Sequence, residues 1–454
     1  MDDGGRSQRY LRLLFVLLVP AAFFNGFDGE LRALLLPQLQ HTFHVRLGTI
    51  GLANIPIGAG QFVAFLAIRL ADRIGRRPLL LISLFGYAAF TGCTAASQSV
   101  WMFALFQFFA QVFAGTEYAL AVIVVLEEFP SATRGRALGG LLVAQAVSVV
   151  AAAGLLGAGL LHTALGWRSF YLIGVIPALA IGFARRYLKE TATFEAERAR
   201  GRLPKREPVR AVFEPPWRRR LLGLGVVSFL VKVPITAGAG LWVYYAEHER
   251  HFSTGLVALF LGVAFGLGTS GYYVCGRLID RFGRRPVASV FLLAAFAAGF
   301  ALFQTGSKPA NFALLLTAVF FGLGVGPALS ALSAESFPTR MRAQASAVVG
   351  NGFANTGELT GPALASVLGE RGGLIGSVGG AVSTLAFLLP VAVPLLWWFV
   401  PETKGTDLSE VPGDVERDSL DGVGDSRAPA ARAKPESGLN GAAAEIANTE
   451  PSAE

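Results

Sequence analysis

The sequence predicts an all-α integral membrane protein in which twelve transmembrane helices form two pseudo-symmetric six-helix lobes. Composition gives the first reason, because 53% of the 454 residues are hydrophobic and only 15% are charged, whereas soluble proteins carry about 25% charged residues. The second reason is the length of the apolar runs, since a helix needs about 20 apolar residues to cross a bilayer. The third is an internal duplication at an offset of 208 residues, which is typical of repeat architectures.

Two basic turns carry the duplication. Each has one acid, one glycine and three arginines between two long apolar runs: Asp72, Arg73, Gly75, Arg76 and Arg77 in the first, and Asp280, Arg281, Gly283, Arg284 and Arg285 in the second. A second repeated element relates Glu127 and Arg134 to Glu335 and Arg342. Charge this dense cannot enter the hydrocarbon, so each basic turn is predicted to connect two membrane helices. Matching basic loops in two repeats of a membrane protein indicate a secondary transporter.

The spans follow a polar lead at residues 1–10. They are predicted near residues 11–36, 47–70, 78–97, 100–125, 137–161, 169–187, 220–245, 255–276, 287–305, 310–333, 343–368 and 375–400. A cleaved signal peptide is disfavoured, because cleavage would remove half of the first span. The predicted domains are therefore an N-terminal lobe at 11–187 and a C-terminal lobe at 220–405.

Lysines and arginines predict the orientation. They concentrate in the loops after the second, fourth, sixth, eighth and tenth spans, while the alternate loops are poor in base. Under the positive-inside rule, both termini and the 188–219 linker are cytoplasmic, in a plasma or inner membrane. The net charge of +8 thus reflects topology and not nucleic-acid binding. The 406–454 tail is acidic and almost without aromatic residues, so we expect it to be disordered.

Charges inside the spans are candidate functional residues, because a charge at the bilayer centre costs at least about 2.5–3.5 kcal/mol. Asp28 and Arg32 lie four residues apart on one helix face and can form a pair, which is either functional or merely structural. Glu117 lies in the middle of the fourth span. Lys232 lies about 18 Å into the seventh span, near the midplane. Glu358 lies near the middle of the eleventh span.

The basic turns have two possible roles. Asp72 and Asp280 can pair with nearby arginines and cap helix ends when the cytoplasmic side is closed, which would make the turns a gate. Glu127 with Arg134, and Glu335 with Arg342, would add a second pair in each lobe. The simpler alternative is that the arginines only anchor the topology.

Other patterns exclude competing classes of protein. Residues 266–271 match G-x-G-x-x-G, but they lie within a span, and a dinucleotide site needs a preceding strand. Cys93 and Cys275 both lie in apolar runs and predict neither a disulfide nor a metal framework. No cluster of nucleophile and base stands out. We therefore expect no enzyme activity, no cofactor and no metal.

The basic turns resemble the loop signature of the major facilitator superfamily, G-x-L-a-D-R-x-G-R-R. Residues 276–280 fit it in full, whereas Ile68 replaces the glycine of the first copy. Residues 26–28 (Gly-Phe-Asp) and 115–118 (Gly-Thr-Glu-Tyr) resemble stretches of aromatic-acid and metabolite symporters, although Gln107 stands where that family has an arginine. Residues 401–405 resemble sugar porters, but the amides that bind sugar hydroxyls are missing from 234–238, which disfavours a hexose.

The resemblance implies a transporter that works by alternating access. We expect a monomer that takes up a small organic anion, such as an aromatic carboxylate, together with protons. Lys232, with Arg32, would hold the carboxylate, and Glu117 or Asp28 would carry the proton. Aromatic neighbours would flank a ring: Tyr118, Trp242 and Tyr244. The alternatives are an exporter or facilitator of a cationic or amphipathic compound, and a transporter-like solute sensor that signals through its acidic tail.

Overall fold

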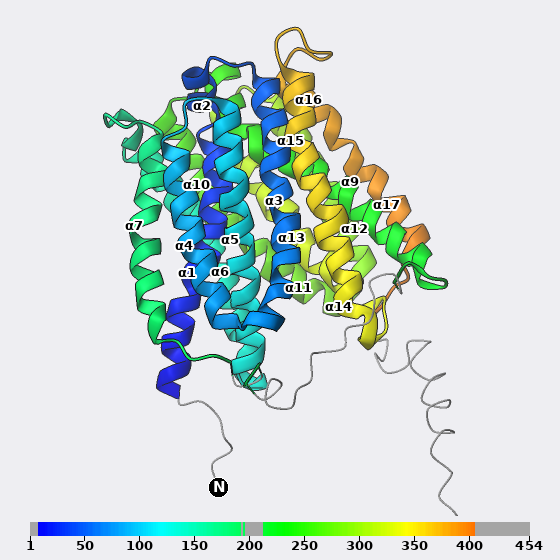
Figure 1. Cartoon of the computed structure of the whole chain (residues 1–454). Coiled ribbons are helices and arrows are strands. Elements are labelled where there is room, and N and C mark those ends of the chain that lie inside the picture. Colours follow the sequence, from blue (N-terminus) through cyan, green and yellow to red (C-terminus); the bar gives the residue numbers. More distant parts are fainter. Residues whose placement is uncertain (1–7, 192–193, 196–211, 405–454) are drawn as a thin grey trace, which may run out of the picture. The chain divides into compact units, whose positions relative to one another are not determined.

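The described part of the chain is helical throughout. The computed structural model describes residues 8–191, 194–195 and 212–404, and within these ranges it contains no strand. The predicted disordered tail and most of the predicted linker lie outside the described residues. The predicted all-α fold class is confirmed (Figure 1).

Six membrane-crossing segments build the N-terminal lobe. They are α1 (Gln8–Leu34) with the short α2 (Leu36–Phe43), α3 (Leu47–Ile74), α4 (Arg76–Ala95), α5 (Val100–Glu128), α6 (Ser131–Gly157) and α7 (Arg168–Ala184). A 3₁₀ turn, η1 (Leu160–His162), lies between α6 and α7, and a second, η2 (Arg185–Tyr187), follows α7.

Six further segments build the C-terminal lobe. They are α9 (Trp217–Tyr244) with the π-helical turn η4 (Tyr245–Glu249), α10 (Thr254–Gly268) with α11 (Ser270–Phe282), α12 (Arg284–Gln304), α13 (Lys308–Glu335), α14 (Thr339–Ala347) with the π-helical η5 (Val348–Ala354) and α15 (Asn355–Gly369), and α16 (Val378–Ala386) with α17 (Leu388–Phe399).

In the described ranges, ten of these segments are long and apolar enough, by length and composition, to cross a membrane. The other two are the 17-residue α7 and the eleventh segment, which η5 interrupts. The twelve predicted spans are thus all present as helices.

Glycine permits the sharp reversal at each basic turn. Gly75 has φ 101° and Gly283 has φ 97°, a backbone region that costs other residues free energy because of their Cβ atom. One helix ends and the next begins at that residue in both lobes. This accounts for the matched glycines in the repeat.

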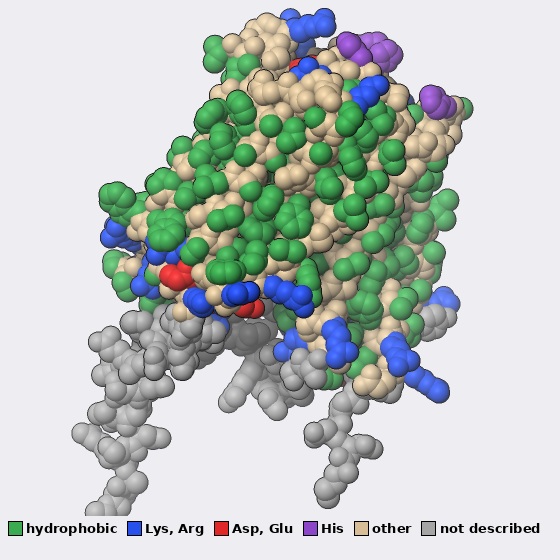
Figure 2. Space-filling model, turned by 180° about the vertical axis from the view of Figure 1, so that it is seen from behind, with side chains coloured by type: hydrophobic (Ala, Val, Ile, Leu, Met, Phe, Trp, Pro, Cys, Tyr) green, Lys and Arg blue, Asp and Glu red, His purple; other side chains and the backbone are tan. Residues whose placement is uncertain are grey.

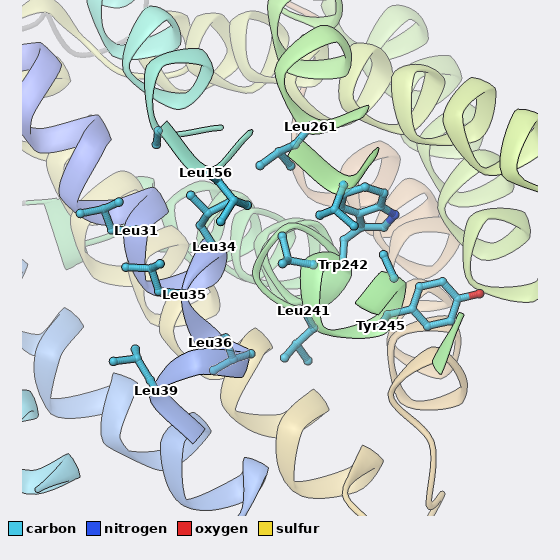
Figure 3. Close-up of a cluster of buried hydrophobic side chains, with 14 of the residues drawn as sticks. Leu31, Leu34, Leu35, Leu36, Leu39, Leu156, Leu241, Trp242, Tyr245 and Leu261 are labelled. Atoms are coloured by element: carbon cyan, nitrogen blue, oxygen red, sulfur yellow. The ribbon is translucent and has the colours of Figure 1, made fainter. Parts of the chain in front are cut away.

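Among the described residues, a buried hydrophobic cluster joins the two lobes at one end of the bundle and not at the other. At the basic-turn end, each lobe has a core cluster of its own. At the opposite end, a single cluster contains residues of both lobes, which we call the outer seal. In Figure 3, Leu34 and Leu156 of the N-terminal lobe lie beside Leu241, Trp242 and Leu261 of the C-terminal lobe. Apolar packing therefore closes this end.

A hydrogen bond between the lobes reinforces the outer seal. The backbone N–H of Gly48, in the first turn of α3, donates to Oε2 of Glu370 at 3.0 Å. Glu370 directly follows α15, so the C-terminal lobe caps a helix of the N-terminal lobe. A carboxylate at a helix N-terminus also interacts favourably with the helix dipole. Glu249 is a comparable cap within one lobe, since it accepts from the N–H groups of Val378 and Gly379.

Replacing Glu370 by Ala is expected to loosen the outer seal. A hydrogen bond to a charged acceptor contributes about 1.5–3 kcal/mol, so a cysteine at the buried Leu39 position should react about tenfold faster with a maleimide in the Glu370→Ala background. The measurement needs Cys93 and Cys275 replaced by Ser. Glu249→Ala is the matched control and should leave the rate unchanged. Equal labelling rates in the Glu370→Ala and Glu370 proteins would show that the cap does not hold the lobes together.

Candidate functional site

An ion pair joins two helices of the C-terminal lobe at its middle. Lys232 Nζ on α9 lies 3.1 Å from Oε2 of Glu358 on α15. Their side chains are 43% and 49% exposed, although both helices are membrane spans. Ionic side chains within spans usually face a partner or a water-filled cavity, and these two face each other while staying half exposed. Lys232 and Glu358 are separate candidates in the sequence, and the structure brings them together.

Groups from both lobes surround this pair. Tyr272 of α11 lies within electrostatic range of Lys232 and Glu358, and Tyr118 of α5 lies within range of Tyr272. Glu30 of α1 lies within range of Glu358. Arg32 of α1 lies within range of both Glu30 and Glu358. The central site therefore combines two cations, two carboxylates and two phenols. Glu30 was not among the predicted site residues, although it is a charge within the first apolar run.

Asp28 and Arg32 do not form the predicted ion pair. Asp28 is fully buried and accepts hydrogen bonds from Nε2 of Gln107 at 3.3 Å and of Gln111 at 3.4 Å. Nε of Arg32 has no hydrogen-bond partner among the described residues. The helical spacing was correctly read, but two amides of α5 reach the carboxylate from a neighbouring helix.

Glu117, one of the two predicted proton carriers, is buried inside the N-terminal lobe in this structure. The Glu117 side chain is 3% exposed and forms an ion pair with Arg185, and it accepts a hydrogen bond from Ser83. Arg185 also donates to the carbonyl oxygen of Leu17 at 2.7 and 3.0 Å. A permanent cation just beyond α7 thus seals the Glu117 carboxylate inside the N-terminal lobe. Arg185 was not predicted as a site residue, although it is a charge within the predicted sixth span at 169–187.

Two aromatic residues expected at the site belong to the outer seal instead. Trp242 is fully buried and its Nε1 donates to Oδ1 of Asn311 at 3.3 Å. Tyr244 stacks on His248 with ring centroids 4.3 Å apart. It lies twelve residues beyond Lys232, which is about 18 Å along a helix. These rings therefore do not flank the central pair.

In each basic turn, the arginine that follows the glycine forms an ion pair with a glutamate at the end of the next long helix. Arg76 lies 2.8 Å from Glu127 at the end of α5. In the other lobe, Arg284 lies 3.0 Å from Glu335 at the end of α13. The duplication thus preserves an interaction as well as a sequence. Each pair joins two helices of the same lobe, and neither connects the two lobes.

The predicted second pairs are therefore wrong. Glu127 was expected to pair with Arg134, and Glu335 with Arg342. In the structure, the arginines of the basic turns form the ion pairs with these two carboxylates instead. Arg134 instead donates to the carbonyl oxygen of Phe129 at 3.2 Å. Nε and Nη2 of Arg342 have no hydrogen-bond partner in the described part of the chain.

The acids of the basic turns have a minor part in this conformation. Asp280 is 76% exposed and lies 3.9 Å from Arg284, one turn away. An exposed pair of this kind contributes little to stability. The side chain of Asp72 lies outside the described residues. Their expected role when the basic-turn end is closed stays a prediction.

Two carboxylates after the sixth and twelfth spans cap the basic turns. Glu190 accepts from the first two backbone N–H groups of α4, at 2.9 and 3.2 Å. Glu402 accepts from the first two of α12, at 2.8 and 2.9 Å. These roles were not predicted, although both glutamates belong to a repeated Glu-Thr dipeptide, Glu190-Thr191 and Glu402-Thr403.

Backbone donors also fix the charge state of Glu402. Burial on its own would raise the pKa of this carboxyl, but N–H groups of Arg284, Arg285, Lys404 and Thr403 together hold its pKa below the usual range. A carboxylate that accepts several backbone N–H bonds is stabilised in its ionised form. The cap is therefore present at neutral pH.

Comparisons with known proteins agree with this architecture. The model of the Major Facilitator Superfamily matches residues 18–353 and 274–434. A probable 4-methylmuconolactone transporter of Cupriavidus pinatubonensis is 27% identical over 404 residues, covering 85% of this chain and 90% of the relative. A putative niacin/nicotinamide transporter of Bacillus subtilis is 30% identical over 393 residues, covering 85% and 94%. The crystal structure of a D-xylose-proton symporter is similar in fold, with a TM-score of 0.69, 18% identity and coverage of 87% and 99%.

Replacing Glu117 by Gln is expected to reduce stability because it leaves Arg185 buried and unpaired. Breaking one side of a buried ion pair costs about 3–5 kcal/mol, so the thermal unfolding temperature in detergent should fall by several degrees. Glu358→Gln is the matched control, since its pair is half exposed, and it should change the unfolding temperature little. Adding Arg185→Met to Glu117→Gln should recover part of the loss. An unchanged unfolding temperature in Glu117→Gln would contradict the sealed-pair assignment.

Proposed function

The chain belongs to the major facilitator superfamily, and from this premise we propose that it takes up a small organic anion together with protons. Membership makes it a multi-pass membrane transporter for small molecules, and its relatives are transporters and not enzymes. The anion, the protons and the direction are our proposal. The observation that carries it is the half-exposed pair of Lys232 and Glu358.

The pair can bind an anion and a proton in one event. A substrate carboxylate competes with Glu358 for the Lys232 ammonium, because both offer the same oxygens. Once displaced, Glu358 has lost the Lys232 ammonium and shares the more distant Arg32 with a second carboxylate, Glu30. Like charges repel, and a proton on either carboxylate relieves the repulsion. Anion and proton would thus favour each other's binding.

The phenols beside the pair favour an unsaturated or aromatic carboxylate. Tyr272 and Tyr118 come from opposite lobes, so a planar substrate between them would contact both. Aromatic rings bind planar apolar surfaces with specific geometry. Relatives named for niacin/nicotinamide and for 4-methylmuconolactone support compounds of this size.

The asymmetry of the cores supports alternating access. The outer seal joins the lobes at one end, whereas at the basic-turn end each lobe has a separate core. Rocking of the lobes around a midplane site would break the seal and bring the basic turns together. In that state Asp72, Asp280 and the neighbouring arginines would form the cytoplasmic gate.

The basic-turn end is the proposed cytoplasmic end, in a bacterial plasma membrane. Figure 2 shows Lys and Arg side chains gathered along it, beneath a broad hydrophobic band. The positive-inside rule assigns such an end to the cytoplasm. Both termini would then be cytoplasmic.

Cysteine labelling tests this orientation. Lys189 at the basic-turn end and Ser307 at the opposite end are both exposed. In a background without Cys93 and Cys275, Ser307→Cys should react with an impermeant maleimide in intact cells. Lys189→Cys should react only after permeabilisation. The reverse pattern would overturn the orientation and the assignment of the gate.

Charge-removing variants of the central pair test the coupling, with nicotinate and cis,cis-muconate as probes in proteoliposomes. Lys232→Gln should weaken anion binding at least about tenfold, since a charge-assisted hydrogen bond contributes about 1.5–3 kcal/mol. Glu358→Gln should still exchange substrate in counterflow but fail to concentrate it in response to a proton gradient, because an amide releases no proton. Lys308→Gln, at the exposed outer rim, is the control and should behave as the parent protein.

Two results would contradict the proposal. Accumulation driven by a proton gradient in Glu358→Gln would remove Glu358 from the coupling step. Undiminished binding in Lys232→Gln would reject the anion site and favour the transport of a cationic compound.

A further inference from the structure

A second polar cluster lies inside the N-terminal lobe, away from the central pair. It contains Asp28 of α1, Gln107 and Gln111 of α5, Thr94 of α4 and Tyr171 of α7, each at most 1% exposed. The central pair is about half exposed, so the two clusters differ in their access to solvent. Nothing in the proposed exchange at Lys232 uses these buried groups.

The charge of Asp28 is poorly satisfied within this cluster. Its two hydrogen bonds come from neutral amides and measure 3.3 and 3.4 Å, which is long for N–H···O bonds. Arg32 is one turn away and within electrostatic range, but no ion pair joins the two in the described residues. A buried carboxylate without a close cation is costly, so the site calls for a positive ligand.

Two buried oxygen atoms beside Asp28 also lack partners. Gln107 donates to Asp28 and to Thr94, while its Oε1 accepts nothing from the described residues. The hydroxyl of Tyr171 likewise has no partner there, and it lies within electrostatic range of Asp28. Unsatisfied buried polar atoms are rare in native structures and call for a ligand, an ion or a water molecule.

The set of donors selects among these ligands. A proton on Asp28 would satisfy one acceptor at most, whereas a hard metal cation accepts lone pairs from several oxygens at once. One carboxylate with neutral amide, hydroxyl and phenol oxygens balances a single positive charge. Secondary transporters bind coupling ions near the bilayer midplane, where backbone and side-chain oxygens coordinate them.

We propose that the Asp28 cluster binds a sodium ion. The ion would neutralise Asp28 and tie together α1, α5 and α7 at a point that the central pair does not reach. This inference goes beyond the proposed anion and proton exchange, and either can hold without the other. Transport would then depend on sodium through the N-terminal lobe and on protons through Glu358.

The test measures sodium binding without any substrate. Purified protein in detergent at constant ionic strength is unfolded thermally in sodium, potassium or choline chloride. Sodium, and not potassium or choline, should raise the unfolding temperature in a saturable way by about 2–4 °C, since a ligand that binds the folded state stabilises it by mass action. Binding of radioactive sodium to the same protein gives an independent readout.

Three variants make the test specific. Asp28→Asn should abolish the sodium-dependent shift. Gln107→Arg places a guanidinium where the amide already contacts Asp28, so it should keep the protein folded while abolishing the shift, and it serves if Asp28→Asn does not fold. Glu358→Gln should retain the shift, because its carboxylate lies in the other cluster.

Several outcomes would overturn the proposal. Equal stabilisation by sodium and potassium, or a sodium shift that survives in Gln107→Arg, would place any ion elsewhere. Absence of a sodium shift in the parent protein would assign the cluster to a proton or a water molecule. Because no substrate is present, none of these outcomes bears on the exchange at Lys232.

Discussion

A charge inside a bilayer must be paired, enclosed by polar groups or turned towards water, and this constraint organises the interior of the protein. Three solutions occur in the described residues. Glu117 is sealed with Arg185. Asp28 is enclosed by amides. The pair of Lys232 and Glu358 is half exposed and in this sense open. Of the three, the open pair is the one that a solute can reach, which is why the function is assigned there.

The duplication preserved the ends of the two lobes but not their centres. In both lobes a turn arginine pairs with the same acid, and a glutamate after the last span caps the same helix start. At the centre, the C-terminal lobe has an exposed ion pair, whereas the N-terminal lobe has buried polar groups. We infer that the retained contacts at the basic-turn ends serve the conformational change in both lobes. The centres of the two lobes have diverged and bind different ligands.

The fold was predictable because its signals are local. Apolar runs, basic turns and the repeat offset each follow from consecutive residues, and all twelve spans were found. The partners of the interior charges were not predictable, because helix packing determines them. Arg185 meets Glu117 across 68 positions in the chain, and α5 amides displace the helical neighbour Arg32 from Asp28. Residues that share one helix face were identified correctly, but the contacts are formed with residues of other helices.

The two residues that form the contact between the lobes, Gly48 and Glu370, tolerate mutation to different extents. The acceptor is a side chain, so most replacements of Glu370 delete it. The donor is a backbone N–H, which every residue except proline retains. At position 48 the restriction is space, because an added Cβ would lie 2.8 Å from Glu370 Oε2. At the outer seal, substitution at position 370 is therefore limited by the need for an acceptor side chain, and substitution at position 48 by the size of the side chain.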